Sequence, residues 1–84
     1  MTKAFTSWTE RNPWRALRRA RCENSYEFAK SLGVPRTTAV SWERGGKVRS
    51  FKRVAKVLKR IGFDDTETMQ FWRDLERHRS ERPQ

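Results

Sequence analysis

Apolar residues recur three and four positions apart in five segments of the chain, the spacing that places them on one side of an α-helix. Capping residues open four of these segments, Pro35 replaces the usual polar cap of the segment 36–44, and Gly follows three of them. Asn12 precedes the first segment and Asn24 the second, with Glu27 placed to complete a capping box. The pattern predicts helices over residues 13–22, 25–33, 36–44, 51–61 and 64–79, and no strand. We therefore expect an all-α, five-helix fold.

The segment 36–44 has two different faces. At 100° per residue, Ala39 and Trp42 share one side, which is predicted to face the core. The opposite side carries Arg36 at its N-terminal margin, then Thr37, Val40, Ser41 and Arg44. We expect this second set to point away from the core, either as a solvated helix face or as a binding surface.

The segment 51–61 places an apolar stripe opposite five basic residues. Lys52 and Arg53 lie in the first helical turn, where each cation opposes the helix dipole at a cost of about 0.3 to 1 kcal/mol. A bound phosphate would remove this conflict, so both residues are candidates for phosphate contact. The other three, Lys56, Lys59 and Arg60, are interpreted as a solvated face.

The segment 64–79 has more apolar surface than one core face accepts. Its four large apolar residues wrap more than half of the predicted helix: Met69, Phe71, Trp72 and Leu75. At least two of them should belong to the core. We expect the segment to form a dimer interface with these residues, or to dock a partner protein.

The charge of the chain is large and unevenly distributed. The 84 residues suffice for one small domain, and 20 Lys and Arg against 10 Asp and Glu give a formal net charge of +10. Residues 1–63 hold 16 basic and 4 acidic side chains, whereas residues 64–84 hold 4 and 6. We therefore expect a polyanion partner that binds before residue 64.

Several classes of protein are disfavoured by the residues that are scarce. One cysteine, Cys22, excludes an internal disulfide, and one histidine, His78, leaves neither a zinc cluster nor a Cys–His nucleophile pair close in sequence. No signal-peptide pattern and no apolar run of about 18 residues is present. We expect a cytoplasmic protein that is not an enzyme and uses no cofactor or metal, with Cys22 and His78 incidental.

Four small or apolar positions follow the spacing of a helix-turn-helix. Gly33 stands four residues after Ala29, and Ala39 and Trp42 follow Ala29 by ten and thirteen residues. A small residue at position 29 lets two helices approach closely, Gly33 permits a tight turn, and the last two pack the second helix on the core. The spacing predicts this motif over residues 25–44.

At these positions the sequence resembles the lambda-repressor-like helix-turn-helix family, also called the XRE or Cro type. The likeness covers residues 12–63 and includes Trp14, Leu17, Arg18, the run Trp42-Glu43-Arg44-Gly45 and the segment Ser50 to Gly62. It implies that Arg36, Thr37 and Ser41 read base edges in the major groove of DNA. Val40 and Arg44 share their helix face, and we add them as base contacts because Val suits a thymine methyl and Arg suits guanine.

The resemblance also implies contacts away from the bases. Ser25 would hold a phosphate, and the loop after the reading helix would grip the DNA backbone through Gly46, Lys47 and Arg49. Arg18 and Glu43 would form an internal ion pair that ties the first helix of the likeness to the reading helix.

Together these observations favour a sequence-specific, double-stranded DNA-binding transcriptional regulator of phage, plasmid or other mobile-element type. It would act as a repressor and as a homodimer on an inverted-repeat operator. The predicted organisation is an arm (1–11), a DNA-binding domain (12–63), a C-terminal helix (64–79) and a tail (80–84), with both ends expected to fray. Two alternatives stay open: an antitoxin or restriction-controller protein that uses the C-terminal helix for a partner, and a basic interaction module for RNA or an acidic protein.

Overall fold

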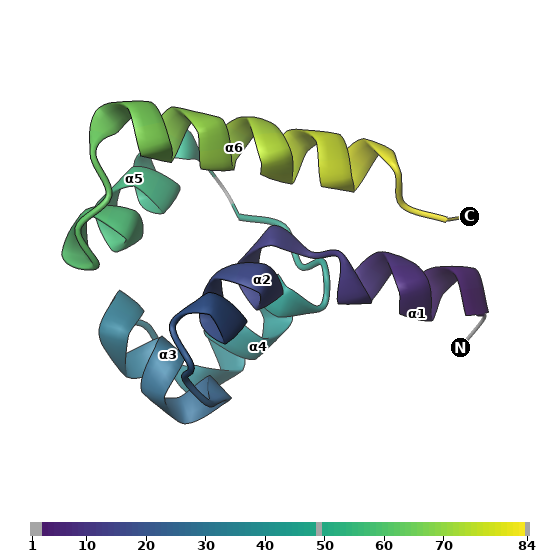
Figure 1. Ribbon diagram of the computed structural model, residues 1–84, viewed down its shortest axis with the longest axis horizontal. Coiled ribbons are helices and arrows are strands. Elements are labelled where there is room, and N and C mark those ends of the chain that lie inside the picture. The colour runs from purple at the N-terminus through teal and green to yellow at the C-terminus, as the bar shows by residue number, and fades with distance from the viewer. Residues whose placement is uncertain (1–2, 49, 84) are drawn as a thin grey trace.

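The computed structural model describes residues 3–48 and 50–83, and within this part the regular structure consists of six α-helices (Figure 1). In chain order they are α1 (Lys3–Glu10), α2 (Pro13–Ala20), α3 (Ser25–Leu32), α4 (Arg36–Glu43), α5 (Phe51–Arg60) and α6 (Asp65–Ser80). No strand occurs among the described residues. The all-α fold predicted from the apolar spacing is confirmed, and the count of five helices is wrong.

The additional helix, α1, lies in the segment that was expected to fray. Trp8 of α1 is 1% exposed and stacks on His78 of α6, with ring centroids 4.2 Å apart. Trp8 Nε1 donates to the carbonyl oxygen of His78 at 2.6 Å, and His78 Nε2 donates to the carbonyl oxygen of Trp8 at 2.8 Å. Figure 1 accordingly shows α1 beside the end of α6. These partners are 70 residues apart, so spacing within the arm could not reveal the helix, and His78 is not incidental.

The helix starts follow the predicted capping residues. The side chain of Asn12 accepts a hydrogen bond from the Trp14 amide at 2.9 Å and opens α2. Its Nδ2 donates to the carbonyl oxygen of Trp42 at 2.9 Å, which ties the start of α2 to the end of α4. Asn24 and Asp64 open α3 and α6 with complete capping boxes. Each box satisfies backbone N–H groups that the helix itself leaves free.

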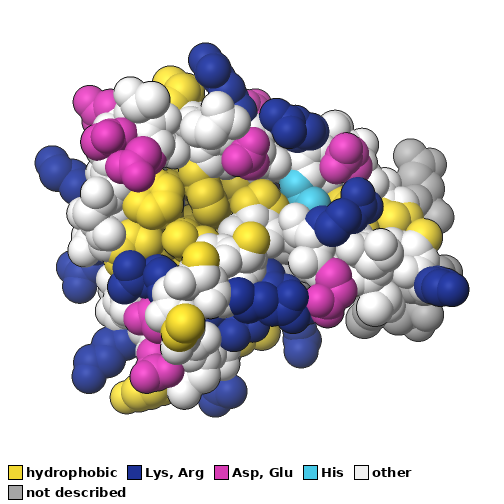
Figure 2. Space-filling model, in the orientation of Figure 1, with side chains coloured by type: hydrophobic (Ala, Val, Ile, Leu, Met, Phe, Trp, Pro, Cys, Tyr) yellow, Lys and Arg dark blue, Asp and Glu magenta, His cyan; other side chains and the backbone are white. Residues whose placement is uncertain are grey.

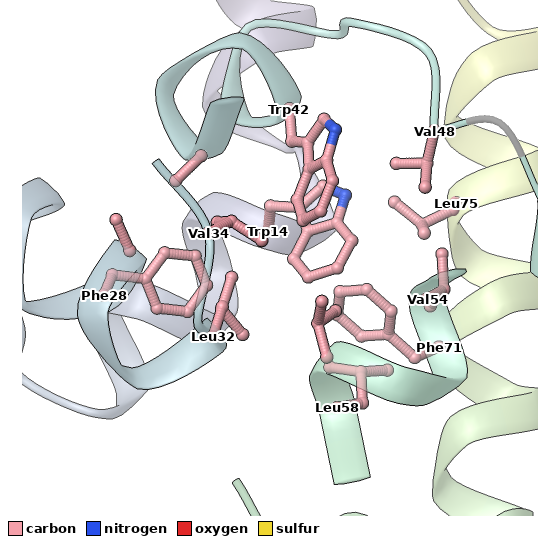
Figure 3. Packing of buried hydrophobic residues seen from close by; sticks show 13 residues of the cluster. Trp14, Phe28, Leu32, Val34, Trp42, Val48, Val54, Leu58, Phe71 and Leu75 are labelled. Carbon is pink, nitrogen blue, oxygen red and sulfur yellow. The ribbon is translucent and has the colours of Figure 1, made fainter. Parts of the chain in front are cut away.

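The core is centred on two tryptophans. Trp14 and Trp42 stack with centroids 4.9 Å apart, and Phe71 meets Trp14 edge-on at 4.8 Å (Figure 3). Around them lie Phe28, Leu32, Val34, Val48, Val54, Leu58 and Leu75. These residues come from α2 to α6 and from the connections between them, so one core holds these five helices together.

The helix packing determines which side of α4 remains at the surface. α3 packs against α4 and α5, α2 packs against α4 and α6, and α5 packs against α6. The inner side of α4 is thus covered by α2 and α3. Its outer side stays open.

Candidate nucleic-acid interface

The two faces predicted for residues 36–44 are separated in the structure. Ala39, Trp42 and Glu43 are buried. The outer side contributes to one surface hollow, lined by Arg36, Thr37, Val40, Ser41, Arg44, Gly45, Gly46 and Arg82. All five residues predicted to contact bases are therefore brought together. Three of the described lining residues are arginines and none is Asp or Glu, which suits an anionic ligand.

Arg36 is anchored at one end of this hollow by Ser25. Its Nε donates to Ser25 Oγ at 3.2 Å. Ser25 and Arg36 are the first residues of α3 and α4, so the bond joins two helix N-termini, each with a partial positive charge. The structure thus places the predicted phosphate contact next to the first predicted base contact.

Two glycines let the chain turn back against the end of α4. The Gly46 amide donates to the carbonyl oxygen of Ser41 at 2.7 Å, and a Cβ at position 46 would collide with Ser41. Gly45 has a φ of +95° and lies against the ring of Trp8, which leaves no space for a Cβ there either. The loop predicted to grip the DNA backbone therefore begins as a tight turn held by Ser41 on one side and Trp8 on the other.

A second hollow beside α4 joins two of the predicted phosphate contacts. Lys47 and Arg53 line it together with Thr38, Trp42, Val48 and Ser50. The guanidinium carbon of Arg53 lies 6.0 Å from the centroid of the Trp42 ring, at the outer limit of a cation–π contact. Arg49, predicted for the same role, lies outside the described residues.

Lys52 lies on another surface. It lines a hollow with Lys56 and Lys59, next to Asp64 and Asp65 at the start of α6. Arg53, the next residue along α5, lines the other hollow, about 100° of helix rotation away. The structure therefore does not bring Lys52 to the α4 surface, although Lys52 and Arg53 both lie in the first turn of α5.

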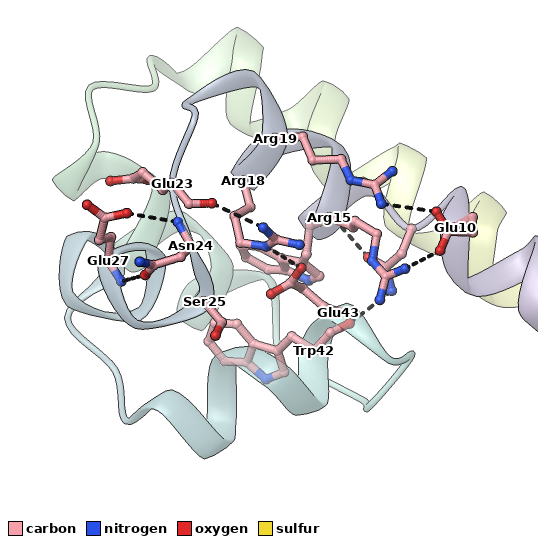
Figure 4. A network of polar contacts seen from close by, with 12 residues as sticks. Glu10, Arg15, Arg18, Arg19, Glu23, Asn24, Ser25, Glu27, Trp42 and Glu43 are labelled. Atoms are coloured by element: carbon pink, nitrogen blue, oxygen red, sulfur yellow. Dashed lines mark hydrogen bonds and ion pairs between the residues drawn. The ribbon is translucent and has the colours of Figure 1, made fainter.

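Arg18 and Glu43 form the internal ion pair that the resemblance implied. Arg18 Nε donates to Glu43 Oε1 at 2.7 Å, with 22% and 6% of the two side chains exposed (Figure 4). Arg18 Nη1 also donates to the carbonyl oxygen of Glu23 at 3.1 Å. The pair joins α2 to the last residue of α4, so its role is to position α4.

The Glu23 side chain extends this network toward α3. It accepts hydrogen bonds from Arg21 Nε at 2.7 Å and from Ser31 Oγ at 2.6 Å. The hydrogen bond from Arg21 is the main cause that lowers the pKa of the Glu23 carboxyl below its ordinary value, and burial opposes it. An ionised Glu23 thus ties the connection between α2 and α3 to α3 itself.

Two of the four residues predicted for a dimer interface are core residues. Phe71 and Leu75 are buried, because α6 lies across α2 and α5 and uses this stripe for folding. The expectation that at least two of the four belong to the core is confirmed, and Phe71 and Leu75 are not accessible for an intermolecular surface. Met69 is 40% exposed, and Trp72 is half-buried with its ring 5.6 Å from that of Phe51.

Arg82 is the charged residue of the α4 hollow that the sequence reasoning missed. It follows α6 in the segment interpreted as a tail. Its guanidinium carbon lies 5.6 Å from the ring centroid of Trp8 and 5.7 Å from that of Phe5. A basic residue near one end of the chain and aromatic residues near the other were visible in the sequence, but no spacing rule connects them.

Comparisons of the chain with protein-family models, with curated proteins and with solved structures find no match. Within the described part of the chain, no helix is long and apolar enough to cross a membrane. The function is therefore inferred from the surfaces described above.

Proposed function

We propose that this protein is a sequence-specific, double-stranded DNA-binding transcriptional regulator in which α3 and α4 form a helix-turn-helix and α4 enters the major groove. The observation that carries the proposal is the α4 hollow, where the outer face of one helix meets three arginines and no carboxylate among the described lining residues. A major groove about 12 Å wide admits an α-helix. The short connection 33–35, with Gly33 at a φ of +73°, provides the tight turn that such a motif needs.

The side chains of this face match the groups that bases present. Arg36 and Arg44 can each pair with O6 and N7 of guanine, the hydroxyl of Ser41 can bond to donors or acceptors, and Val40 can contact a thymine methyl. In the free protein Arg36 donates to Ser25. Base reading by Arg36 therefore competes with this bond, and its release leaves the Ser25 hydroxyl for a phosphate.

The second hollow supplies contacts that position the helix without reading sequence. Lys47 and Arg53 lie on the flank of α4, where the sugar-phosphate chain bordering the groove would pass. Neither residue forms an ion pair with an acidic group among the described residues. Their charges are thus available to neutralise phosphates.

Selection of bound duplexes from a random pool tests this proposal. We expect an enriched consensus, and we expect Arg36→Ala to relax the preference at particular base pairs with a loss of about 1 to 3 kcal/mol for the preferred site. Arg73→Ala is the matched control, because Arg73 is exposed on α6 and lines neither α4 hollow. Equal affinity for all duplexes, or an unchanged consensus for Arg36→Ala, contradicts the proposal.

We also propose that the protein acts as a homodimer and represses transcription by occupying an inverted-repeat operator. Met69 and Trp72, next to Phe51, leave apolar surface on α6 and α5. Figure 2 shows further apolar side chains at the surface between α6 and α2. A dimer would set two reading helices about one helical turn, roughly 34 Å, apart on one side of the duplex.

A further inference from the structure

The first helix and the end of the last helix form a clasp beside the α4 hollow. Trp8 is at the centre of this clasp and forms two hydrogen bonds with His78. The Trp8 ring lies against Gly45, and the Arg82 guanidinium lies over the same ring. Phe5 offers Arg82 a second ring from the same helix, and the two rings are 5.6 Å apart. Arg82 is therefore held at the C-terminal end of α4 by residues from the opposite end of the chain.

Arg82 carries a charge that no carboxylate neutralises among the described residues. The ion pairs of this part of the chain engage Arg15, Arg18, Arg19, Arg21 and Arg77, and Arg82 is in none of them. A guanidinium that lies over an aromatic ring uses its flat face and keeps the N–H donors at its edge. Those donors are free to bind an oxyanion.

We propose that Arg82 binds a backbone phosphate of the duplex beside the base pairs that α4 reads, and that α1 is the element that positions it. The inference rests on the proposed function and adds both ends of the chain to the DNA-binding surface. The hollow of Arg82 shares no lining residue with the hollow of Lys47 and Arg53, so these cations border α4 at two separate places. A guanidinium held beside the reading helix meets the sugar-phosphate chain that borders the groove, and such contacts fix the position of the helix.

The salt dependence of affinity for the selected duplex tests Arg82 directly. The slope of log affinity against log salt is negative, and loss of one phosphate contact reduces its magnitude by about 0.9. This change corresponds to about fivefold weaker binding near 0.15 M salt. We expect this change for Arg82→Gln, with the consensus unchanged. Arg73→Gln removes the same charge from an exposed site on α6 outside the hollow and should keep the wild-type slope. Arg82→Lys keeps the charge and should keep the slope as well, which assigns the effect of the glutamine variant to the lost charge.

A second variant tests the positioning role of α1. Phe5→Leu removes one ring face from Arg82 and leaves Trp8 in place. We expect it to weaken binding by the protein that has Arg82 and to have no effect in the Arg82→Gln background. An equal effect in both backgrounds overturns the positioning role.

The outcomes separate this inference from the proposed function. Equal slopes for Arg82→Gln and Arg73→Gln overturn the inference, while relaxed specificity in Arg36→Ala leaves the proposed function standing. No sequence preference in the unaltered protein overturns both.

Discussion

Replacing Glu43 by Ala should destabilise the fold by about 2 to 3 kcal/mol, because it removes the acceptor that holds Arg18. Removing one partner of a fully buried ion pair costs about 3 to 5 kcal/mol, and an exposed pair is worth about 0 to 1 kcal/mol. With 6% of the Glu43 side chain and 22% of the Arg18 side chain exposed, this pair lies between these limits. Arg18 also keeps its bond to the Glu23 carbonyl in the variant, which reduces the loss.

The two single variants should not be equivalent. Arg18→Ala leaves the more deeply buried carboxylate without a cation, whereas Glu43→Ala leaves a guanidinium that reaches water. We therefore expect Arg18→Ala to be the more destabilising of the two. The double variant should cost less than the sum of the single ones, because both remove the same interaction.

Thermal and urea unfolding followed by circular dichroism measure these differences. A domain of this size loses about 4 to 8 °C per kcal/mol, so Glu43→Ala should lower the melting temperature by at least about 8 °C. Asp74→Ala is the control, since its 3.7 Å pair with Arg77 has side chains that are 40% and 67% exposed. If Glu43→Ala and Asp74→Ala have the same melting temperature, the Arg18–Glu43 pair contributes no more than a solvated pair and the reasoning is refuted.

Other predictions follow from the charged hollows and α6. Lys47→Ala and Arg53→Ala should each weaken binding to all duplexes alike and reduce the magnitude of the slope of log affinity against log salt by about 0.9. Lys52→Ala should change this slope less, because Asp64 and Asp65 line the same hollow as Lys52. Titrations of the three variants at several salt concentrations measure the difference. Trp72→Glu should shift the protein toward monomer in sedimentation, because Trp72 lies on the apolar surface proposed for the dimer. A wild-type complex that contains one subunit per duplex would exclude the dimer. The lowered pKa of Glu23 predicts a stability contribution that is complete above the ordinary value of 4.5 and is lost as the pH falls through the folded-state pKa; acid unfolding of Glu23→Gln, which lacks this dependence, measures it.

The parts of the fold that the sequence predicts are those set by local interactions. Asn24 and Glu27 cap α3 within one turn, and Gly33 ends it in a left-handed conformation, so neighbouring residues are enough to locate this helix. The position of α1 depends on Trp8 and His78, which are 70 residues apart in sequence and are brought together only by the tertiary fold. α1 and α3 are both eight residues long, so the long-range contact of Trp8 and not the length of the helix separates the two cases.

The candidate site divides in the same way. The outer face of α4 was predictable because helix geometry fixes which residues share a side once Ala39 and Trp42 are buried. The separation of Lys52 from Arg53 depends on which helices border each side of α5, and their shared place in its first turn does not reveal it. Arg82 could not be predicted, since its place in the hollow depends on rings from α1.

The contact between Trp8 and His78 also has a consequence for the order of folding. It closes a loop of 70 residues, and closing such a loop in a flexible chain costs about 4 kcal/mol of chain entropy. Once α2 to α6 have packed, the two partners are separated only by the short link between α1 and α2, and most of that cost has already been met by the core. Docking of α1 is therefore favoured as a late step, and α1 is the element that should open first, with its amides exchanging with solvent faster than those of the tryptophan-centred core.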